Sequence, residues 1–226
     1  MIIFFDIETL PTNDAEVIAE MGRTITAPAQ YKKPESIKEW LAENKESALK
    51  EMVAKTSFDG ALGRIACISW AIDDGEIHAT SPEDTELQML ETFRLVCATA
   101  DINYHGGSTR GEVQFCGHNV AGFDIPFLKH RSIIHAVKPH PAFMKAAKAK
   151  SWDTCILDTM LMWSQEREKR IGMDKLCRVL GIPGKGDFDG SMVAETWPTD
   201  PQKVIEYCKD DVARTRDIYK RLTFTI

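Results

Sequence analysis

Hydrophobic positions mark a first strand and a hairpin in the N-terminal third of the chain. Residues 2–7 are a short apolar run of strand-forming residues, and Pro11 ends the segment that follows it. Residues 62–72 alternate between apolar and polar positions, as a half-buried strand does. The Asp-Asp-Gly sequence at 73–75 is typical of a tight turn. We therefore expect residues 76–80 to return as the second strand of a hairpin.

Helical periodicity dominates the rest of the chain. Apolar residues recur at three- and four-residue spacing and predict helices over 83–99, 124–135, 173–180 and 201–222. The remaining segments are predicted as a loop at 101–112, a strand at 113–116, a strand that passes into a helix at 155–163, and a loop with one short helix at 184–200. A hairpin followed by alternating strands and helices predicts an α/β fold, a mixed β-sheet flanked by helices.

Residues 14–60 differ from the segments around them, because they are mostly polar. Pro34 and Ser36 are helix start signals, and Ile37, Trp40 and Leu41 follow at helical spacing. We predict one or two surface helices that form a helical insertion after the first strand. The simplest organisation is a single domain over residues 1–226, in which the insertion either closes over the strand end or contacts a partner.

Composition excludes several classes of protein. Hydrophobic residues make up 43% and charged residues 27% of the chain, as in ordinary globular proteins. No apolar run approaches the roughly 18 residues of a membrane span, and the N-terminus lacks the pattern of a signal peptide. We therefore expect a cytoplasmic protein without a membrane partner. Six widely spaced cysteines without a CxxC pair predict buried, reduced thiols instead of a zinc site.

The net charge of −6 argues against a protein that coats long nucleic acids, which is usually basic. It does not argue against an enzyme that holds one strand end. Basic residues gather in two places, which are Lys145, Lys148 and Lys150, and Arg167, Lys169 and Arg170. Each group is either a solvated surface or a contact to phosphate.

Two acidic residues stand at the end of the first predicted strand. Side chains alternate along a strand, so Asp6 and Glu8 share one face with Phe4, while Ile3 and Ile7 lie on the other face. Two like charges that point the same way repel each other unless a cation lies between them. The pair is either a set of ligands for a divalent cation, which prefers oxygen donors, or a solvated strand end.

The last predicted helix separates two neighbouring aspartates. Asp211 and Tyr207 fall on or beside its apolar stripe, one turn apart, whereas Asp210 and Arg214 fall on the polar side. An inward carboxylate is costly unless a metal, a cation or a hydrogen-bond network compensates it. Asp211 is therefore a candidate ligand, with a hydrogen bond to nearby backbone as the alternative.

A third acidic position follows a predicted strand and a short turn. Asp124 precedes Ile-Pro at the start of a predicted helix, where an aspartate is a good N-cap. The same position is also where α/β folds place active-site groups. His118, in the turn before it, is either a ligand or base or a structural residue.

Taken in order, these segments resemble the DEDD exonuclease superfamily of the proofreading type, which has an RNase H-like fold. The family motifs are strand-borne Asp-x-Glu-Thr, then His-Asn with a following aromatic residue and Asp, then Tyr-x-x-x-Asp. Here they read Asp6-Ile7-Glu8-Thr9, His118-Asn119 with Phe123-Asp124, and Tyr207 with Asp211. Tyrosine in the third motif is typical of the tyrosine subtype. The stretches 185–191 and 207–222 are similar to stand-alone exonucleases related to the proofreading domain of family B DNA polymerases.

The resemblance implies a 3′-5′ exonuclease that hydrolyses single-stranded DNA from its 3′ end to 5′-mononucleotides. It implies two divalent cations, Mg²⁺ or Mn²⁺, that clamp the attacking and leaving oxygens. Asp6 would bridge both cations, Glu8 and Asp211 would complete the site of the cation that activates water, and Asp124 would hold the second. Tyr207 would orient the attacking water, because a phenol with a pKa of about 10 is a poor base.

The resemblance also implies contacts between the terminal nucleotide and residues beside the motifs. These candidate substrate-binding residues are Thr9, Leu10, His118, Asn119 and Phe123. Phe123 either stacks on a base or packs in the core, and Asn119 is expected to hydrogen-bond sugar or phosphate. Such contacts carry little information about base sequence.

Other functions stay open at this point. An exoribonuclease would share the architecture, because the choice between DNA and RNA rests on contacts near the 2′ position. A non-catalytic module that binds nucleic-acid ends would be expected to lack a carboxylate, and all four are present here. Residues 31–56 could also dock onto a replication or repair protein, such as a polymerase or helicase.

Overall fold

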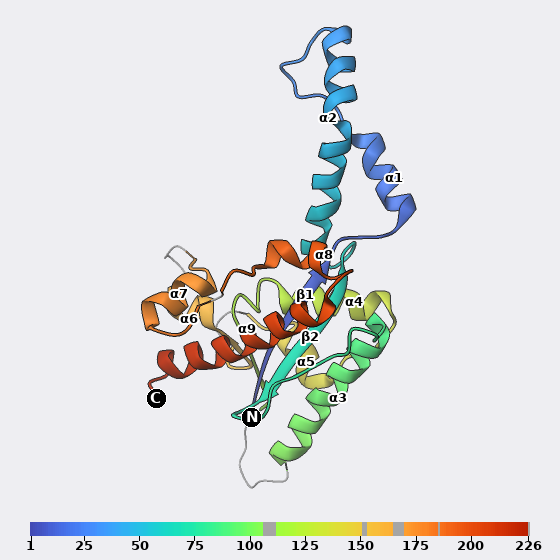
Figure 1. Ribbon diagram of the computed structural model, residues 1–226. Helices are drawn as coiled ribbons and strands as arrows, with labels where there is room; N and C mark the ends of the chain where they lie inside the picture. The colour runs from blue at the N-terminus through green and yellow to red at the C-terminus, as the bar shows by residue number, and fades with distance from the viewer. Residues whose placement is uncertain (106–111, 151–152, 165–169, 185, 226) are drawn as a thin grey trace.

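A mixed β-sheet forms the centre of the protein (Figure 1). The computed structural model describes residues 1–105, 112–150, 153–164, 170–184 and 186–225. Its strands are β1 (Ile2–Leu10), β2 (Arg64–Ile72), β3 (His78–Ala79), β4 (Gln114–Gly117) and β5 (Ile156–Asp158). The order is β3-β2-β1-β4-β5, antiparallel from β3 to β1 and parallel from β1 to β5. β1 is therefore the middle strand, and its carboxyl end shares an edge of the sheet with those of β4 and β5.

Helices cover both faces of this sheet, as the sequence pattern predicts. One face packs against α3 (Glu86–His105), α4 (Asp124–Ile134) and α5 (Pro141–Ala146). The other face packs against α8 (Val193–Thr196) and α9 (Pro201–Leu222). Two further helices, α6 (Thr159–Ser164) and α7 (Met173–Leu180), lie against α9. Among the described helices, none is both long and apolar enough to cross a membrane.

The alternation along β1 explains why it holds the two faces together. Ile3, Phe5 and Ile7 are buried in the core cluster on the α3 side. Phe4, on the opposite side, is buried with Val212 of α9. Complete burial of one such side chain contributes roughly 1.5–3 kcal/mol. β1 is thus apolar on both faces until Asp6, where polar side chains first appear on the α9 side.

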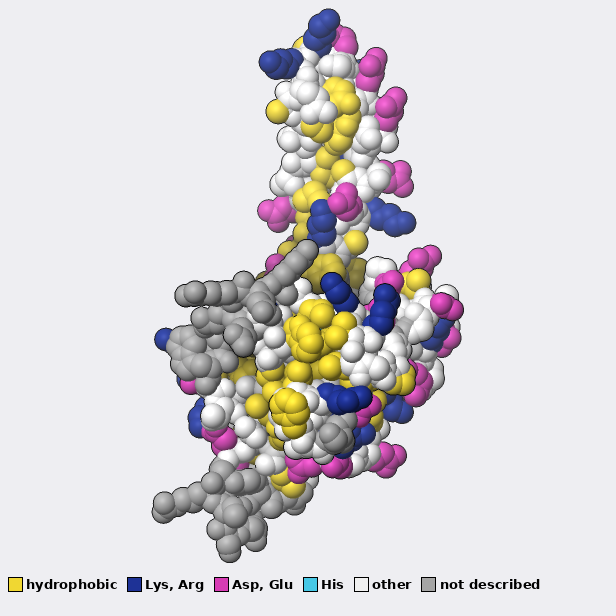
Figure 2. All heavy atoms as spheres, turned by 90° about the vertical axis from the view of Figure 1, so that its left-hand side faces the viewer, with side chains coloured by type: hydrophobic (Ala, Val, Ile, Leu, Met, Phe, Trp, Pro, Cys, Tyr) yellow, Lys and Arg dark blue, Asp and Glu magenta, His cyan; other side chains and the backbone are white. Residues whose placement is uncertain are grey.

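The predicted helical insertion is an arm that stands clear of the sheet (Figure 1). It consists of α1 (Ala15–Thr24) and α2 (Pro34–Lys55), neither of which contains a buried residue. Figure 2 shows a hydrophobic stripe along the arm, with acidic and basic side chains beside it. The two helices pack mainly on each other. The short 3-10 helix η1 (Thr56–Phe58) returns the chain from α2 towards β2.

Three boundaries differ from the prediction. α3 runs to His105 instead of ending near residue 99, because Cys97 and Ala100 continue its buried face. Part of the predicted loop 101–112 is therefore helical, and its residues 106–111 lie outside the described part of the chain. α5 was not predicted in the basic segment 139–152, yet Pro141 begins it and the His140 side chain caps it. The returning strand β3 has two residues only, as Thr80 turns inward to donate its N–H to Ile68 and accept from the Ile68 N–H.

All six cysteines are buried and none forms a disulfide, which confirms the prediction of reduced thiols.

Candidate active site

Carboxylates from opposite ends of the chain meet beside the central strand. One oxygen each from Asp6, Glu8 and Asp211 lies within 4.8 Å of the other two. Asp6 and Glu8 belong to β1, and Asp211 belongs to α9, which packs across the same face of the sheet. Roughly 200 residues of chain separate the first pair from the third acid, so the cluster is a product of tertiary structure.

The strand geometry brings Asp6 and Glu8 to this face. Asp6 pairs with Ser69 and Glu8 with Cys67 in the antiparallel ladder between β1 and β2. The Cys208 thiol of α9 lies 3.5 Å from Asp6 Oδ2, which confirms that Asp6 points towards α9. The register shifts between Glu8 and Thr9, as at a β-bulge, and such a bulge re-aims the side chains that follow it.

Residues of α9 divide between buried and exposed sides largely as the helical period predicts. Asp211 is 3% exposed, whereas the side chain of Asp210 keeps 65% of its exposure. The prediction that Arg214 lies on the polar side of the helix is wrong, because its side chain is only 13% exposed. Its Nη1 donates to Asp211 Oδ1 at 2.8 Å, which fixes the orientation of that carboxylate.

Tyr207 lies one turn before Asp211 and is buried beside the carboxylates. Its ring packs edge-on against Phe188 at a centroid distance of 5.0 Å. Burial raises the pKa of Tyr207 well above its usual 10, and the charges of Asp211, Glu8 and Asp6 raise it further. This shift favours the protonated phenol, which is a hydrogen-bond donor.

Asp124 lies next to the cluster but outside the closest group of three. It is the first residue of α4 and not its N-cap, which is Phe123. Asp124 Oδ1 accepts from the Ile7 N–H at 3.2 Å, so α4 is tied directly to β1 between the two strand acids. Burial raises the pKa of Asp124 to about 7, with further contributions from Asp158 and Asp211. A nearby cation would favour the charged form of this carboxyl.

The turn before Asp124 is organised by Asp158, an acid that sequence reasoning missed. Asp158 is 4% exposed at the end of β5. Its Oδ1 accepts from the Asn119 N–H and its Oδ2 from the Ala121 N–H, both at 3.0 Å. Asn119 has a φ of +65°, a conformation that asparagine tolerates better than most residues. The available signal was an aspartate directly after an apolar run, the same pattern that singled out Asp6.

His118 and Asn119 form hydrogen bonds that stabilise this turn. The His118 ring contacts the Thr159 hydroxyl through Nδ1 at 2.9 Å and the Ile171 carbonyl through Nε2 at 3.0 Å. The backbone carbonyl of Asn119 accepts from the N–H groups of Gly122 and Phe123, which closes the turn. A contact between either residue and substrate stays a prediction.

The other predicted substrate contacts lie at the end of β1 or facing it. Thr9 Oγ1 donates to the Ser57 carbonyl at 2.7 Å, while Leu10 is buried at 4% exposure with Val193 and Val204. Phe123 is half-buried, with its ring 5.6 Å from that of Phe127. One side of the Phe123 ring therefore packs in the core, and the rest of the ring stays accessible.

The basic groups named from the sequence are only partly described. Lys145 pairs with Glu112, so its charge is already compensated within the protein. Arg167 and Lys169 lie outside the described residues. Near the cluster, Lys203 places its Nζ 5.1 Å from the centre of the Phe188 ring.

The donors of the cluster fit a hard divalent cation. Asp6, Glu8 and Asp211 offer carboxylate oxygens, which hard cations prefer as ligands. Three like charges at this separation repel each other, and a cation among them removes that cost. The acidic cluster is therefore compatible with the divalent metals that nucleases of this kind use.

Comparison with known proteins agrees with this fold. A solved structure, that of the family B DNA polymerase from the hyperthermophilic archaeon Pyrobaculum calidifontis, superposes with a TM-score of 0.56 at 15% sequence identity. The match covers 98% of this chain and 24% of the polymerase, so the chain spans about a quarter of that protein. No curated protein sequence matches the chain.

The fold is that of the matching part of this family B DNA polymerase, a mixed α/β fold with helices on both faces of the sheet, as the sequence predicted. Residues 62–225 match a family described as a predicted 3′-5′ exonuclease related to the exonuclease domain of PolB. The chain belongs to this family, which implies a nucleic-acid substrate. The matched region begins after β1, so Asp6 and Glu8 lie outside it.

Proposed function

We propose that this protein is a 3′-5′ exodeoxyribonuclease that hydrolyses single-stranded DNA ends to 5′-mononucleotides by two-metal-ion catalysis. The proposal rests on one observation above all, the convergence of Asp6, Glu8 and Asp211 within 4.8 Å of one another. Family membership supports the polarity, because the family is described as a predicted 3′-5′ exonuclease. Asp124, buried beside Asp211, is proposed as the fourth ligand.

In this mechanism Asp6, Glu8 and Asp211 would hold Mg²⁺ or Mn²⁺. The bound cations would supply Lewis acidity, a lowered pKa for the attacking water and charge neutralisation at the phosphate. Arg214 keeps Asp211 aligned through its 2.8 Å hydrogen bond. An all-carboxylate donor set suits these two metals better than softer ones.

Tyr207 completes the site as a neutral donor. Its raised pKa favours the protonated hydroxyl, so the phenol is suited to orient a water or a phosphate oxygen as a hydrogen-bond donor. Edge-on packing against Phe188 holds the ring beside the carboxylates. Because the bound cations would lower the pKa of the attacking water, activation of this nucleophile would need no protein base.

Digestion of end-labelled substrates tests the proposal. The purified chain is incubated with single-stranded DNA, duplex DNA and RNA, each labelled at either the 3′ or the 5′ end, with Mn²⁺ or Mg²⁺ and with excess chelator as a control. Immediate release of a labelled mononucleotide from 3′-labelled single-stranded DNA is the expected result, and Asp6→Asn should abolish it. Faster loss of RNA would favour the exoribonuclease alternative. Binding without hydrolysis by the wild-type chain would leave only the end-binding module.

We further propose that residues 1–226 act as one exonuclease domain. The cytoplasmic location and a replication or repair partner for residues 31–56 stay predictions from the sequence.

A further inference from the structure

The strand opposite Glu8 contains one extra residue. β1 advances by a single residue from Glu8 to Thr9. Over the same step its partner β2 advances by two residues, from Cys67 to Ile65, so Ala66 is the extra residue of a β-bulge. Neighbouring residues on a regular strand face opposite sides of the sheet, but Ala66 and Cys67 both pack in the hydrophobic cluster against α8 and α9. Such a bulge disrupts the ladder and re-aims the side chains beside it.

Glu86, the first residue of α3, supplies an acceptor at this bulge. Its Oε1 accepts from the N–H of Ile65, the neighbour of the extra residue, at 2.8 Å. The Glu86 side chain is 13% exposed, and a backbone N–H in such surroundings is costly to leave without an acceptor. A side chain from a separate helix therefore fixes the backbone of β2 opposite Glu8.

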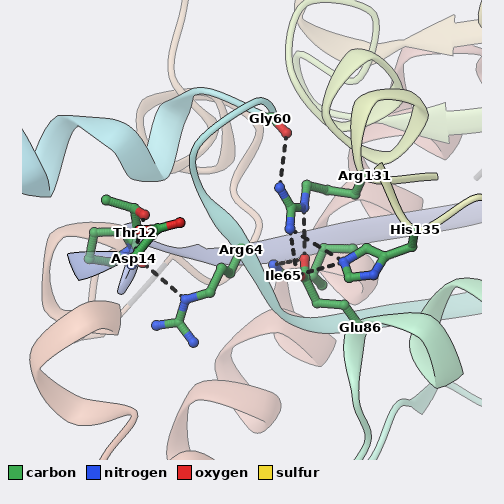
Figure 3. Close-up of polar contacts among 9 residues, drawn as sticks. Thr12, Asp14, Gly60, Arg64, Ile65, Glu86, Arg131 and His135 are labelled. Carbon is green, nitrogen blue, oxygen red and sulfur yellow. Dashed lines mark hydrogen bonds and ion pairs between the residues drawn. The ribbon is translucent and has the colours of Figure 1, made fainter. Parts of the chain in front are cut away.

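Arg131 of α4 holds the Glu86 carboxylate in place (Figure 3). Arg131 Nε donates to Glu86 Oε1 at 3.0 Å and Nη2 donates to Oε2 at 2.7 Å, a bidentate arrangement that fixes the orientation of both groups. Arg131 Nη1 also donates to the Gly60 carbonyl at 3.4 Å, and His135 Nε2 lies 3.0 Å from Glu86 Oε2. The carboxylate therefore has little freedom to leave the Ile65 N–H.

The Glu86–Arg131 pair joins two elements on which acids of the candidate active site depend. Arg131 lies on α4, whose first residue is Asp124. Glu86 contacts β2 at the bulge opposite Glu8. Neither Glu86 nor Arg131 belongs to the acidic cluster itself. Hydrophobic residues of similar volume stabilise a fold as well as a buried ion pair does, so stability alone does not require two buried charges here.

We propose that Glu86 and Arg131 are positioning residues for the acidic cluster. By holding the bulge, they keep Glu8 at the distance from Asp6 and Asp211 that cation binding requires. This inference rests on the proposed metal-dependent function and adds two residues that lie outside the carboxylate motifs. Neither residue contacts the cation or the substrate, and each acts through Glu8.

Paired replacement of both charges tests this role. Glu86→Leu combined with Arg131→Met removes the acceptor of the Ile65 N–H, leaves no buried charge unpaired and keeps the net charge of the chain. Glu91→Leu combined with Arg94→Met is the matched control, because this pair also lies on α3 but its side chains are 42% and 38% exposed. Electron paramagnetic resonance measures the Kd of Mn²⁺ without substrate. The first variant should bind Mn²⁺ about 10- to 100-fold more weakly than the wild-type chain, and the control should bind it equally.

A thermodynamic cycle with Glu8→Gln shows whether the effect passes through Glu8. In the Glu8→Gln chain, the replacement of Glu86 and Arg131 should weaken Mn²⁺ binding by less than about twofold, because the ligand that they position is already lost. Losses that multiply fully in the combined variant would overturn the proposal. Equal Mn²⁺ affinity in the wild-type chain and in the chain without the Glu86–Arg131 pair would overturn it as well.

Hydrogen exchange of backbone amides gives a second readout without metal. Replacement of the Glu86–Arg131 pair should speed exchange of the Ile65 N–H, because its acceptor is gone. The N–H of Ile68, also on β2 and bonded to Thr80 Oγ1 at 3.0 Å, should keep its protection. An unchanged rate at Ile65 would contradict the role of Glu86 at the bulge. A wild-type chain that binds no Mn²⁺ would instead overturn the proposed metal site, and with it the proposed function.

Discussion

Asp210 and Asp211 provide a matched pair of variants, because they are adjacent in sequence and opposite in environment. Asp211 lies in the carboxylate cluster at 3% exposure, while the Asp210 side chain is 65% exposed. Two unit charges 4.8 Å apart repel by roughly 3.5 kcal/mol at an effective dielectric constant of about 20. Asp211→Asn removes two such repulsions and replaces the ion pair with Arg214 by a neutral hydrogen bond; the two changes oppose each other, so this variant should still fold without metal.

Cation binding should then separate the two variants. At a free Mn²⁺ concentration of about 100 times the Kd, binding stabilises the folded wild-type chain by about 2.7 kcal/mol. For a chain of 226 residues this raises Tm by about 5–10 °C. Loss of a direct ligand should weaken binding by at least the roughly 100-fold that changes around metal sites reach, and the rise in Asp211→Asn should shrink to about 1 °C.

Asp210→Asn should keep the full Mn²⁺-induced rise in Tm. Its ion pair with Arg214 is an exposed contact at 3.4 Å, which contributes only about 0.3–0.5 kcal/mol. Thermal unfolding with and without Mn²⁺ measures the shift, and single-strand digestion should fall by about 1,000-fold in Asp211→Asn alone. Equal losses in both variants, or an unchanged shift in Asp211→Asn, would refute the assignment of Asp211 to the metal site.

Three further predictions concern the residues that hold the site in place. Arg131→Ala should lower the free energy of unfolding by about 3–5 kcal/mol, because it leaves Glu86 buried without its closest charge partner, whereas the exposed Arg94→Ala should cost under about 1 kcal/mol in urea titrations. Burial acts to raise the pKa of Glu86, but the hydrogen bonds and charge around it hold the pKa below its usual 4.5. The resulting stabilisation is present above about pH 4.5 and is lost as the pH falls further, so the difference in unfolding free energy between wild type and Glu86→Gln should narrow in acid. A difference that stays constant with pH would contradict this. Asp158→Asn should reduce kcat by about tenfold, because it loosens the turn before Asp124. The Mn²⁺-induced rise in Tm should persist, because the three clustered acids stay intact. Loss of that rise in Tm would instead make Asp158 part of the metal site.

The parts of the site that follow from a local period were predictable. Alternation along residues 2–7 separates Asp6 from Ile3 and Ile7, and the helical period separates Asp211 from Asp210. Both assignments depend only on which side of one element is apolar. Burial on β1 and α9 agrees with them, because each element has its apolar surface where the pattern predicts.

Contacts between distant elements were not predictable in this way. Arg214 has the sequence position of a surface residue, yet its side chain is only 13% exposed and donates to Asp211, three residues earlier on the same helix. Asp158 holds a turn almost 40 residues earlier in the chain. Phe58 is a lone aromatic residue in a polar segment, and nothing local shows that it faces Phe123. Each of these depends on how the helices and loops dock around the sheet.

The central place of β1 shows that the sheet of the family region depends on residues that precede the matched region. Residues 62–225 match the exonuclease family, yet β2 and β4 within that region are joined only through β1. Without residues 1–61 the sheet would lose its middle strand, and the cluster would keep one acid of three.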